Sequence, residues 1–230
     1  MRTWIWWPCR LACRIYFTLF HRRRIVGRET FPPAGAVLVL ANHASFLDPP
    51  FVGSATPRLC YFLARSSLAR IPLFGRLLRA VGVHFVDREG SARAGLARAI
   101  ESLEAGEVLC MFPEGTRTAT GEVGEFRSGA LLVLRRVPVP VVPAGVRGTF
   151  RAWPRMHKLP RPVRCAVHFG PPMTAAEVLA PGGFEELRRR VAELAGSPLA
   201  PAIARGDDPS EGSDGGARPS TVGPIPISTS

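Results

Sequence analysis

A histidine and an aspartate stand five residues apart in the segment NHASFLD (residues 42–48), directly after the apolar run of residues 36–40. On a continuous helix, two side chains with this spacing would point about 140° apart. A loop would instead let the Asp48 carboxylate fold back onto the His43 imidazole. A carboxylate on one ring nitrogen fixes the tautomer and stabilises the imidazolium, so the other nitrogen can take a proton from a hydroxyl. The segment therefore predicts a general base.

The same two residues also fit a purely structural role. Asp48 precedes Pro49 and Pro50, and proline is tolerated in the first turn of a helix, so the carboxylate could cap a helix N-terminus. His43 would then be a hydrogen-bonded residue of the core. Taken alone, the segment leaves both roles open.

The segment FPEGTR (residues 112–117) follows another apolar run, residues 108–111. A strand that opens into Gly, Thr and Arg offers backbone N–H groups and a guanidinium, which together suit a phosphate. The structural alternative is a simple turn in which Glu114 pairs with Arg117.

A third segment, GVHFVDR (residues 82–88), ends an apolar run with Arg88. Its structural alternative is an ion pair between Asp87 and Arg88. Because the carboxyl ends of parallel strands meet at one edge of a sheet, all three segments would converge there. This convergence favours a functional site over three separate structural roles.

The elements that must position these residues alternate between strand and helix. The apolar patterns predict strands at residues 36–40, 59–63, 83–86, 108–112, 139–142 and 163–169. They predict helices at residues 67–80, 91–105, 128–136 and 184–194. This alternation is typical of an α/β fold, a single layered domain over residues 25–196 with a largely parallel β-sheet flanked by helices.

Residues 1–24 contain six arginines, no acid and many aromatic side chains. Their longest uncharged apolar run, residues 15–20, is far shorter than the ~20 residues of a membrane-spanning helix. We expect a helix lying in the membrane interface, with Trp4, Trp6 and Trp7 at headgroup depth. The alternative is a terminal helix packed on the body of the protein.

The chain has 230 residues and a net charge of +12, and only one of its 30 basic residues, Lys158, is a lysine. This charge favours anionic partners, but no nucleic-acid-binding motif is present, so we expect no nucleic acid. The five cysteines form no CxxC pair, which argues against a disulfide framework and a zinc site and favours a reducing compartment. Residues 197–230 are rich in Pro, Gly and Ser and predict a disordered tail.

Four blocks, NHASFLD, GVHFVDR, FPEGTR and VPVVPAGVRG, resemble in content and order those of the glycerolipid acyltransferases of the 1-acylglycerol-3-phosphate (lysophosphatidate) acyltransferase type. The resemblance spans residues 37–148. It implies that His43 and Asp48 are the catalytic pair, and that residues 139–148 serve donor binding or core structure. It also implies that an acceptor-phosphate site is shaped by Arg88, Glu114, Gly115, Thr116 and Arg117.

The resemblance implies transfer of a fatty acyl group from acyl-CoA or acyl carrier protein to the sn-2 hydroxyl of 1-acylglycerol 3-phosphate, without a metal or other cofactor. The partners would be a lysophospholipid acceptor and an anionic membrane surface, at the cytoplasmic face of the cell membrane as a peripheral or monotopic protein. Arg65 and Arg127 stand where the family often has lysine, and the two cations differ in geometry, which bears on acceptor choice. The alternatives are another lysolipid acceptor (lysophosphatidylglycerol or a lyso-aminolipid), a thioesterase-like hydrolase, and a non-catalytic basic lipid-binding protein.

Overall fold

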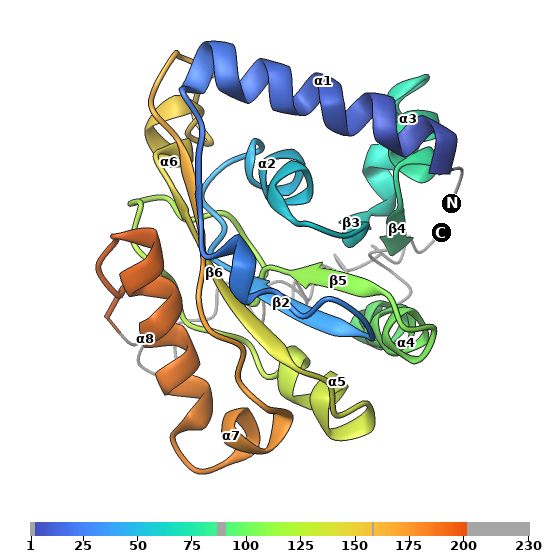
Figure 1. Cartoon of the computed structure of the whole chain (residues 1–230), viewed down its shortest axis with the longest axis vertical. Helices are drawn as coiled ribbons and strands as arrows, with labels where there is room; N and C mark the ends of the chain where they lie inside the picture. The colour runs from blue at the N-terminus through green and yellow to red at the C-terminus, as the bar shows by residue number, and fades with distance from the viewer. Residues whose placement is uncertain (1–2, 87–90, 158, 202–230) are drawn as a thin grey trace, which may run out of the picture.

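The computed structural model describes residues 3–86, 91–157 and 159–201, which form a seven-stranded sheet covered by helices on both faces (Figure 1). The strand order is β1-β7-β6-β2-β5-β3-β4, and every neighbouring pair is parallel except β6 and β7. The strands are β1 (Arg24–Val26), β2 (Val37–Ala41), β3 (Cys60–Arg65), β4 (Val83–Val86), β5 (Val108–Met111), β6 (Val141–Arg147) and β7 (Ala166–Phe169). The predicted α/β layering with a largely parallel sheet is confirmed.

The helices divide between the two faces of the sheet (Figure 1). One face carries α2 with α1 across its outer side, and the other carries α4, α5, α7 and α8. The α-helices are α1 (Thr3–His21), α2 (Asp48–Ala55), α3 (Phe74–Ala80), α4 (Ser91–Glu104), α5 (Gly129–Arg136), α6 (Thr149–Ala152), α7 (Ala175–Leu179) and α8 (Gly183–Ala195). Two short 3₁₀ helices are η1 (Arg28–Thr30) and η2 (Ser66–Arg70).

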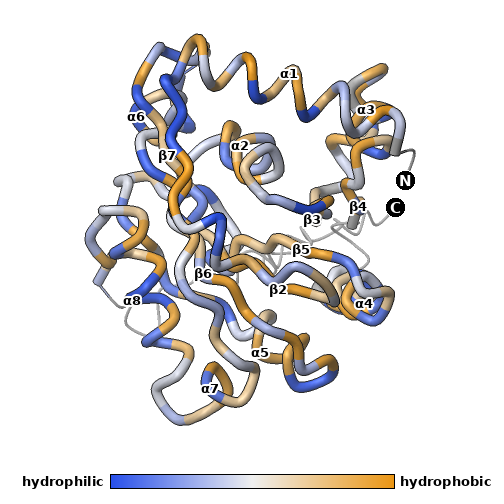
Figure 2. The backbone as a smooth tube through the Cα atoms, viewed as in Figure 1, coloured by the Kyte–Doolittle hydropathy of each residue, from blue (hydrophilic) through white to orange (hydrophobic). Residues whose placement is uncertain are grey.

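The central strand β2 is buried on both faces, as expected for a parallel sheet with helices on each side. Successive side chains of a strand point to opposite faces. Val37 and Val39 accordingly join the core beneath α1 and α2, whereas Leu38 and Leu40 join the core beneath α4, α5 and α8. Figure 2 shows the central strands as a band of apolar residues. This rigid strand carries His43 two residues beyond its end.

Helix α1 packs on α2 through one flank, where the rings of Phe17 and Phe51 stack with centroids 4.4 Å apart. Trp6 is 7% exposed and faces the body, so the expectation that it reaches headgroup depth is wrong; Trp4 and Trp7 are exposed. The packing alternative therefore holds for one flank of α1, while apolar residues also run along the rest of the helix (Figure 2). Among the described residues, no helix combines the length and apolarity needed to cross a bilayer.

The helix predicted over residues 67–80 is interrupted in the structure. The chain forms η2 and then α3, separated by a break at residues 71–73. Pro72 has no backbone N–H, and it disfavours helical backbone in the residue before it, so the helix cannot run through. Leu73 has φ 61°, which completes the break.

The strand predicted at residues 139–142 runs on to Arg147 as β6, because Pro143 and Gly145 do not end it. The Pro143 carbonyl still accepts a hydrogen bond from the Gly170 N–H at 2.8 Å. Gly145 is where the backbone of α8 approaches the strand, since a Cβ there would lie 2.1 Å from the Ala195 nitrogen. The glycine thus serves helix–sheet contact rather than strand termination.

Residues 197–201, which the composition assigns to a disordered tail, contact the body of the protein. Val123 pairs with Leu199 in an isolated bridge, and the Arg188 guanidinium donates to the Ala200 carbonyl at 2.7 Å. These contacts order residues 197–201 against the body, an arrangement that composition alone does not reveal. The rest of the predicted tail lies outside the described residues.

Candidate active site

The first candidate pair comes together in the structure. His43 follows β2 in a loop, and Asp48 begins α2, so the loop folds back and places the His43 Nδ1 2.9 Å from the Asp48 Oδ2. The Asp48 side chain is fully buried, while that of His43 is 20% exposed. A buried partner on Nδ1 leaves the Nε2 edge of the imidazole as the one that can meet a substrate.

The Asp48 carboxylate serves the loop and the imidazole rather than the helix N-terminus. Its Oδ2 also accepts the backbone N–H groups of Ala44 at 2.6 Å and Ser45 at 2.7 Å. Pro49 and Pro50 supply no N–H in the first turn of α2, and the N-cap position, Leu47, makes no side-chain capping bond. Capping is thus excluded as the role of Asp48.

The second oxygen of Asp48 has no hydrogen-bond partner among the described residues, although it is buried. A buried carboxylate with spare acceptor capacity is costly unless a positive charge lies beside it. Protonation of His43 supplies that charge within hydrogen-bonding distance.

Glu114 follows the neighbouring strand β5 and accepts a hydrogen bond from the backbone of His43. Its side chain is buried; Oε1 accepts the backbone N–H of His43 at 2.7 Å and Oε2 accepts that of Gly124 at 3.0 Å. Burial raises the pKa of Glu114, although the two N–H bonds act in the opposite direction. Both oxygens point into the protein, so Glu114 contributes to the site by fixing the loops that surround it.

One further contact involves the His43 ring and another fixes the strand end before it, and the sequence predicted neither. The Phe112 ring stacks on the His43 ring, with centroids 4.3 Å apart and planes 22° apart. The buried Asn42 side chain accepts the Val146 N–H at 2.7 Å and donates to the carbonyl of the same residue at 3.1 Å, which ties the end of β2 to β6. Phe112 opens the FPEGTR segment, but nothing in that segment indicated a contact with His43.

Arg117 reaches the same edge of the sheet from the loop after β5. Its guanidinium lies 3.4 Å from the centroid of the Phe46 ring, which belongs to the His43–Asp48 loop. A cation over an aromatic face is stabilised by the ring quadrupole. This contact places the predicted phosphate-binding guanidinium against the loop that carries the candidate base.

Two of the other residues predicted to shape the phosphate site, Gly115 and Thr116, are described by the structure. Gly115 and Thr116 are exposed at the turn after β5, and Gly115 has φ +72°, a conformation that favours glycine. The Arg127 side chain lies against Gly115, since a Cβ there would lie 3.0 Å from Arg127 Nε. Arg88 lies outside the described residues.

The backbone N–H groups of residues 43–45 all donate to carboxylates, so in this conformation none of them is available to an oxyanion. Ser45 is fully buried and donates its hydroxyl to the Trp153 carbonyl at 2.8 Å, which suits a structural role and not a nucleophile. In the described part of the chain, no group of three or more His, Cys, Asp or Glu side chains is placed to hold a metal ion.

The structure thus brings a buried carboxylate, an oriented imidazole and an arginine to the carboxyl edge of a parallel sheet. The family model described as Acyltransferase matches residues 22–147, more than half of the chain. The chain belongs to this acyltransferase family.

Named relatives agree with this assignment. A Mycoplasma pneumoniae protein described as a probable 1-acyl-sn-glycerol-3-phosphate acyltransferase is 38% identical over 133 residues, covering 54% of this chain and 49% of that protein. A Borreliella burgdorferi protein named 1-acyl-sn-glycerol-3-phosphate acyltransferase is 30% identical over 127 residues, covering 54% and 51%. The matched part thus spans about half the length of these curated relatives.

A solved structure is similar over most of the chain. The crystal structure of the 1-acyl-sn-glycerophosphate (LPA) acyltransferase PlsC from Thermotoga maritima superposes with a TM-score of 0.72 at 27% identity, covering 84% of this chain and 78% of that one. The seven-stranded α/β architecture is therefore shared well beyond the matched motifs.

Proposed function

We propose that this chain transfers a fatty acyl group from acyl-CoA or acyl carrier protein to the sn-2 hydroxyl of 1-acylglycerol 3-phosphate, forming phosphatidate. The observation that carries the proposal is the His43–Asp48 pair, 2.9 Å apart, with the Arg117 guanidinium against the same loop. The names of the relatives support the choice of acceptor.

The proposed chemistry needs no covalent enzyme intermediate, because a thioester is already activated. His43 Nε2 takes the proton of the acceptor hydroxyl as its oxygen attacks the thioester carbonyl carbon. The tetrahedral intermediate then breaks its carbon–sulfur bond, and the leaving thiolate takes the proton back from the imidazolium. Asp48 stabilises the imidazolium between these steps, and we expect no metal or other cofactor to take part.

Arg117 would hold the acceptor phosphate, together with Arg88. Fixing the phosphate turns a bimolecular encounter into an oriented one, with the hydroxyl held against His43. Planar guanidinium groups bind phosphate oxygens in pairs, which suits a headgroup phosphate.

The decisive experiment supplies a panel of lysolipid acceptors with labelled acyl-CoA or acyl-carrier protein and resolves the product lipids. We expect phosphatidate from 1-acylglycerol 3-phosphate as the main product. Arg117→Ala should raise the KM for this acceptor about 10- to 150-fold, the cost of a charge-assisted contact, and leave the KM for the donor nearly unchanged. Arg155→Ala, which removes an exposed arginine from a different loop, is the matched control.

Three other results would contradict the proposal. A different lysolipid as the preferred acceptor would replace the substrate and keep the reaction. Release of free CoA without any acceptor would indicate a thioesterase-like hydrolase. Lipid binding without turnover for every acceptor would indicate a non-catalytic lipid-binding protein.

We also propose that α1 holds the enzyme on the cytoplasmic face of the membrane, where its lipid acceptor lies. The support is a set of large apolar side chains on α1 that are more than half exposed: Trp4, Trp7, Leu11, Ile15, Leu19 and Phe20. Such side chains gain free energy by entering the headgroup–acyl boundary. Leu19→Glu should weaken binding to phosphatidylglycerol vesicles, whereas Leu159→Glu, at a similarly exposed position outside α1, should not.

A further inference from the structure

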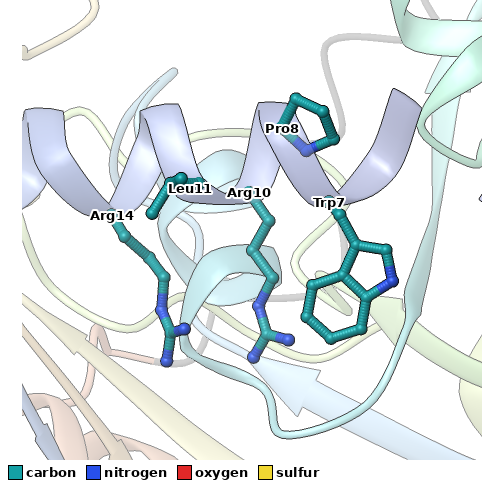
Figure 3. A pocket seen from close by; sticks show the side chains of 5 residues that line it. All are labelled: Trp7, Pro8, Arg10, Leu11 and Arg14. Carbon is teal, nitrogen blue, oxygen red and sulfur yellow. The ribbon is translucent and has the colours of Figure 1, made fainter. Parts of the chain in front are cut away.

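Arg10 and Arg188 are both buried, with 5% and 6% of their surface exposed. The Arg10 side chain extends from α1 beside Arg14 (Figure 3), and its guanidinium donates to the Thr56 carbonyl just after α2. Arg188 lies on α8, and its guanidinium donates to three backbone carbonyls instead of one. A buried guanidinium is costly unless its donors are used. What Arg188 holds in place therefore depends on the segments to which those three carbonyls belong.

The three carbonyls belong to two segments that meet at α8. Arg188 Nε donates to the Gly124 carbonyl at 2.9 Å, and Nη2 donates to the carbonyls of Val123 at 3.2 Å and Ala200 at 2.7 Å. Val123 and Gly124 lie in the loop after β5, which also carries Arg117. Ala200 lies in the C-terminal segment, residues 197–201, which follows α8. The guanidinium thus joins the loop after β5 to the last described part of the chain.

The same two segments are also joined backbone to backbone. The Val123 N–H donates to the Pro198 carbonyl and the Ala200 N–H donates to the Val123 carbonyl, both at 2.9 Å. On the other side, the Gly124 N–H donates to Glu114 Oε2 at 3.0 Å. Together with the guanidinium bonds, these contacts give every backbone N–H and C=O of Val123 and Gly124 a partner. This part of the loop is therefore held between α8 with the C-terminal segment and the Glu114 carboxylate.

Glu114 connects this part of the loop to the candidate base. Its Oε1 accepts the His43 N–H at 2.7 Å while Oε2 accepts the Gly124 N–H. A Cβ at Gly124 would lie 3.0 Å from Oε2, so the backbone runs directly against the carboxylate. Glu114 is only 6% exposed, so solvent offers little replacement for the Gly124 N–H if the loop shifts. A shift of this backbone would therefore leave one oxygen of Glu114 unpaired and loosen its hold on His43.

The loop after β5 contacts the segment around His43 at further points. The Thr118 N–H donates to the His43 carbonyl at 2.9 Å. Arg117, the residue before it, lies with its guanidinium 3.4 Å from the centroid of the Phe46 ring. Both contacts come from the stretch between β5 and residues 123–124, so fixing those two residues limits how far the whole stretch can move.

We propose that Arg188 is a positioning residue for the active site and acts on His43 through the loop after β5. The hydrogen bonds run from α8 to residues 123–124, from there to Glu114, and from Glu114 to His43. The C-terminal segment takes part, because its backbone supplies the other bonds that hold residues 123–124. The proposal deepens the acyl transfer proposed above and rests on it. Both α8 and the C-terminal segment lie outside residues 22–147, which the family model matches.

The first test measures acyl transfer to a soluble short-chain acceptor by the full chain. Arg188→Met removes the guanidinium donors and keeps much of the side chain's bulk. We expect kcat to fall about three- to tenfold, because His43 is held less precisely against the acceptor hydroxyl. Arg189→Gln changes an exposed arginine on the same helix and should leave kcat within about twofold.

A double-mutant cycle separates positioning from a general loss of stability. The amide oxygen of Glu114→Gln can accept only one of the two N–H groups, so this variant already breaks the link. Adding Arg188→Met to it should therefore lower kcat by less than about twofold more. Leu103→Ala, which leaves a cavity in the core beneath α4, is the control for stability: it should lower the melting temperature yet keep kcat within about twofold where the protein is folded.

Amide hydrogen exchange tests the link without any reaction. In Arg188→Met, the N–H groups of His43 and Gly124 should exchange about tenfold faster or more, whereas that of Val39 in β2 should not change. Arg188→Lys serves if the methionine variant does not fold. Lysine keeps the charge but has no planar fork to reach the three carbonyls together, so we expect the same effects at smaller size.

Additive losses in the cycle, or a loss of kcat no larger than that of Leu103→Ala, would overturn the positioning role. Exchange at His43 that is unchanged in the folded Arg188 variants would overturn it as well. If the wild type transfers no acyl group to any acceptor while exchange at His43 still depends on Arg188, the proposed reaction is wrong and the link to His43 stands. If transfer proceeds equally well in wild type and Arg188→Met, the reaction stands and the positioning role is wrong.

Discussion

The protein places two histidines beside carboxylates, one pair at each end of the strands of the same sheet. His43 and Asp48 lie at the carboxyl ends of the strands, 2.9 Å apart. His84 enters β4, and its Nε2 lies 3.9 Å from an oxygen of Glu107, just before β5 at the amino ends of the strands. Both pairs combine the same chemical groups, yet we propose a role in proton transfer for the first pair alone.

The difference lies in what surrounds each carboxylate. Asp48 is fully buried and receives two backbone N–H bonds besides the imidazole, so its position is fixed. Glu107 is a quarter exposed and also accepts the Ser102 hydroxyl, so its charge is shared with solvent and a neutral donor. Burial lowers the pKa of His84, and the Glu107 charge opposes this only in part. A histidine–carboxylate contact thus indicates catalysis only where the carboxylate is immobilised for that imidazole.

Removing the two histidines in turn gives the largest expected contrast. His43→Ala should lower the acyl-transfer rate about 10²–10⁴-fold, the usual contribution of a general base, with little change in the melting temperature. His84→Ala, the matched control, should leave the rate within about twofold. A His43→Ala protein that keeps more than about a tenth of the wild-type rate would rule out a general-base role.

Asp48→Asn tests whether charge, and not only position, distinguishes the first pair. The asparagine oxygen can still accept the Ala44 and Ser45 N–H groups, so the loop should keep its shape. The amide cannot stabilise an imidazolium, and we expect kcat to fall about 10- to 150-fold, the range for a hydrogen bond to a charged group. Thermal melting measured alongside kinetics separates this effect from unfolding, and an unchanged kcat would refute it.

The sequence predicted the His43–Asp48 contact better than the contacts that this loop makes with other strands. The strand-then-loop pattern at residues 36–48 allowed a contact between His43 and Asp48, because both lie in one short segment. The convergence of three segments and the order of the four blocks were needed to favour this contact over a helix-capping role for Asp48. Glu114 was selected as a phosphate-site residue, but its bonds to His43 and Gly124 depend on two strands becoming neighbours, which a local pattern does not show. The Phe112 stacking has the same long-range origin.

In the fold, too, local patterns predicted the elements, whereas features that depend on long-range packing were missed. Apolar runs located most strands, whereas the break at Pro72 was missed because the apolar spacing continued across it. Strand β6 was predicted too short because Pro143 and Gly145 resemble terminators until the close approach of α8 to Gly145 is known. Helix α1 was predicted to be interfacial from its composition, but which tryptophan faces α2 depended on tertiary packing.

Glu114→Gln tests the brace that the His84 pair lacks. An amide has one acceptor oxygen, so it cannot accept from both His43 and Gly124, and we expect a loss of about 1–3 kcal/mol in the free energy of unfolding and about tenfold or less in kcat. Because burial raises the pKa of Glu114, folding binds its proton more tightly. Wild-type stability from this group therefore falls as pH rises from about 4.5 through the raised pKa.

Denaturant titrations across this pH range should show the decline in the wild type and a weaker decline in Glu114→Gln. Glu29→Gln, at an exposed position near the start of the sheet, is a control for the loss of one carboxylate. Identical pH slopes for the wild type and Glu114→Gln would mean that Glu114 ionises without a penalty in the folded protein.

The smallest effect is expected from Glu107→Gln, which breaks the second pair. The Gln oxygen can still accept the Ser102 hydroxyl, so the free energy of unfolding at pH 8 should fall by about 1 kcal/mol or less. Loss of the negative charge should lower the pKa of His84 further below its ordinary value, which an NMR titration of the imidazole measures directly. Because the folded state then resists protonation more strongly, the variant should lose more stability than the wild type as pH falls below about 6.5.

The acyl-transfer rate of Glu107→Gln should stay within about twofold of the wild-type rate. A loss as large as that of Asp48→Asn would show that the amino ends of the strands take part in the reaction and that the two pairs are not functionally distinct.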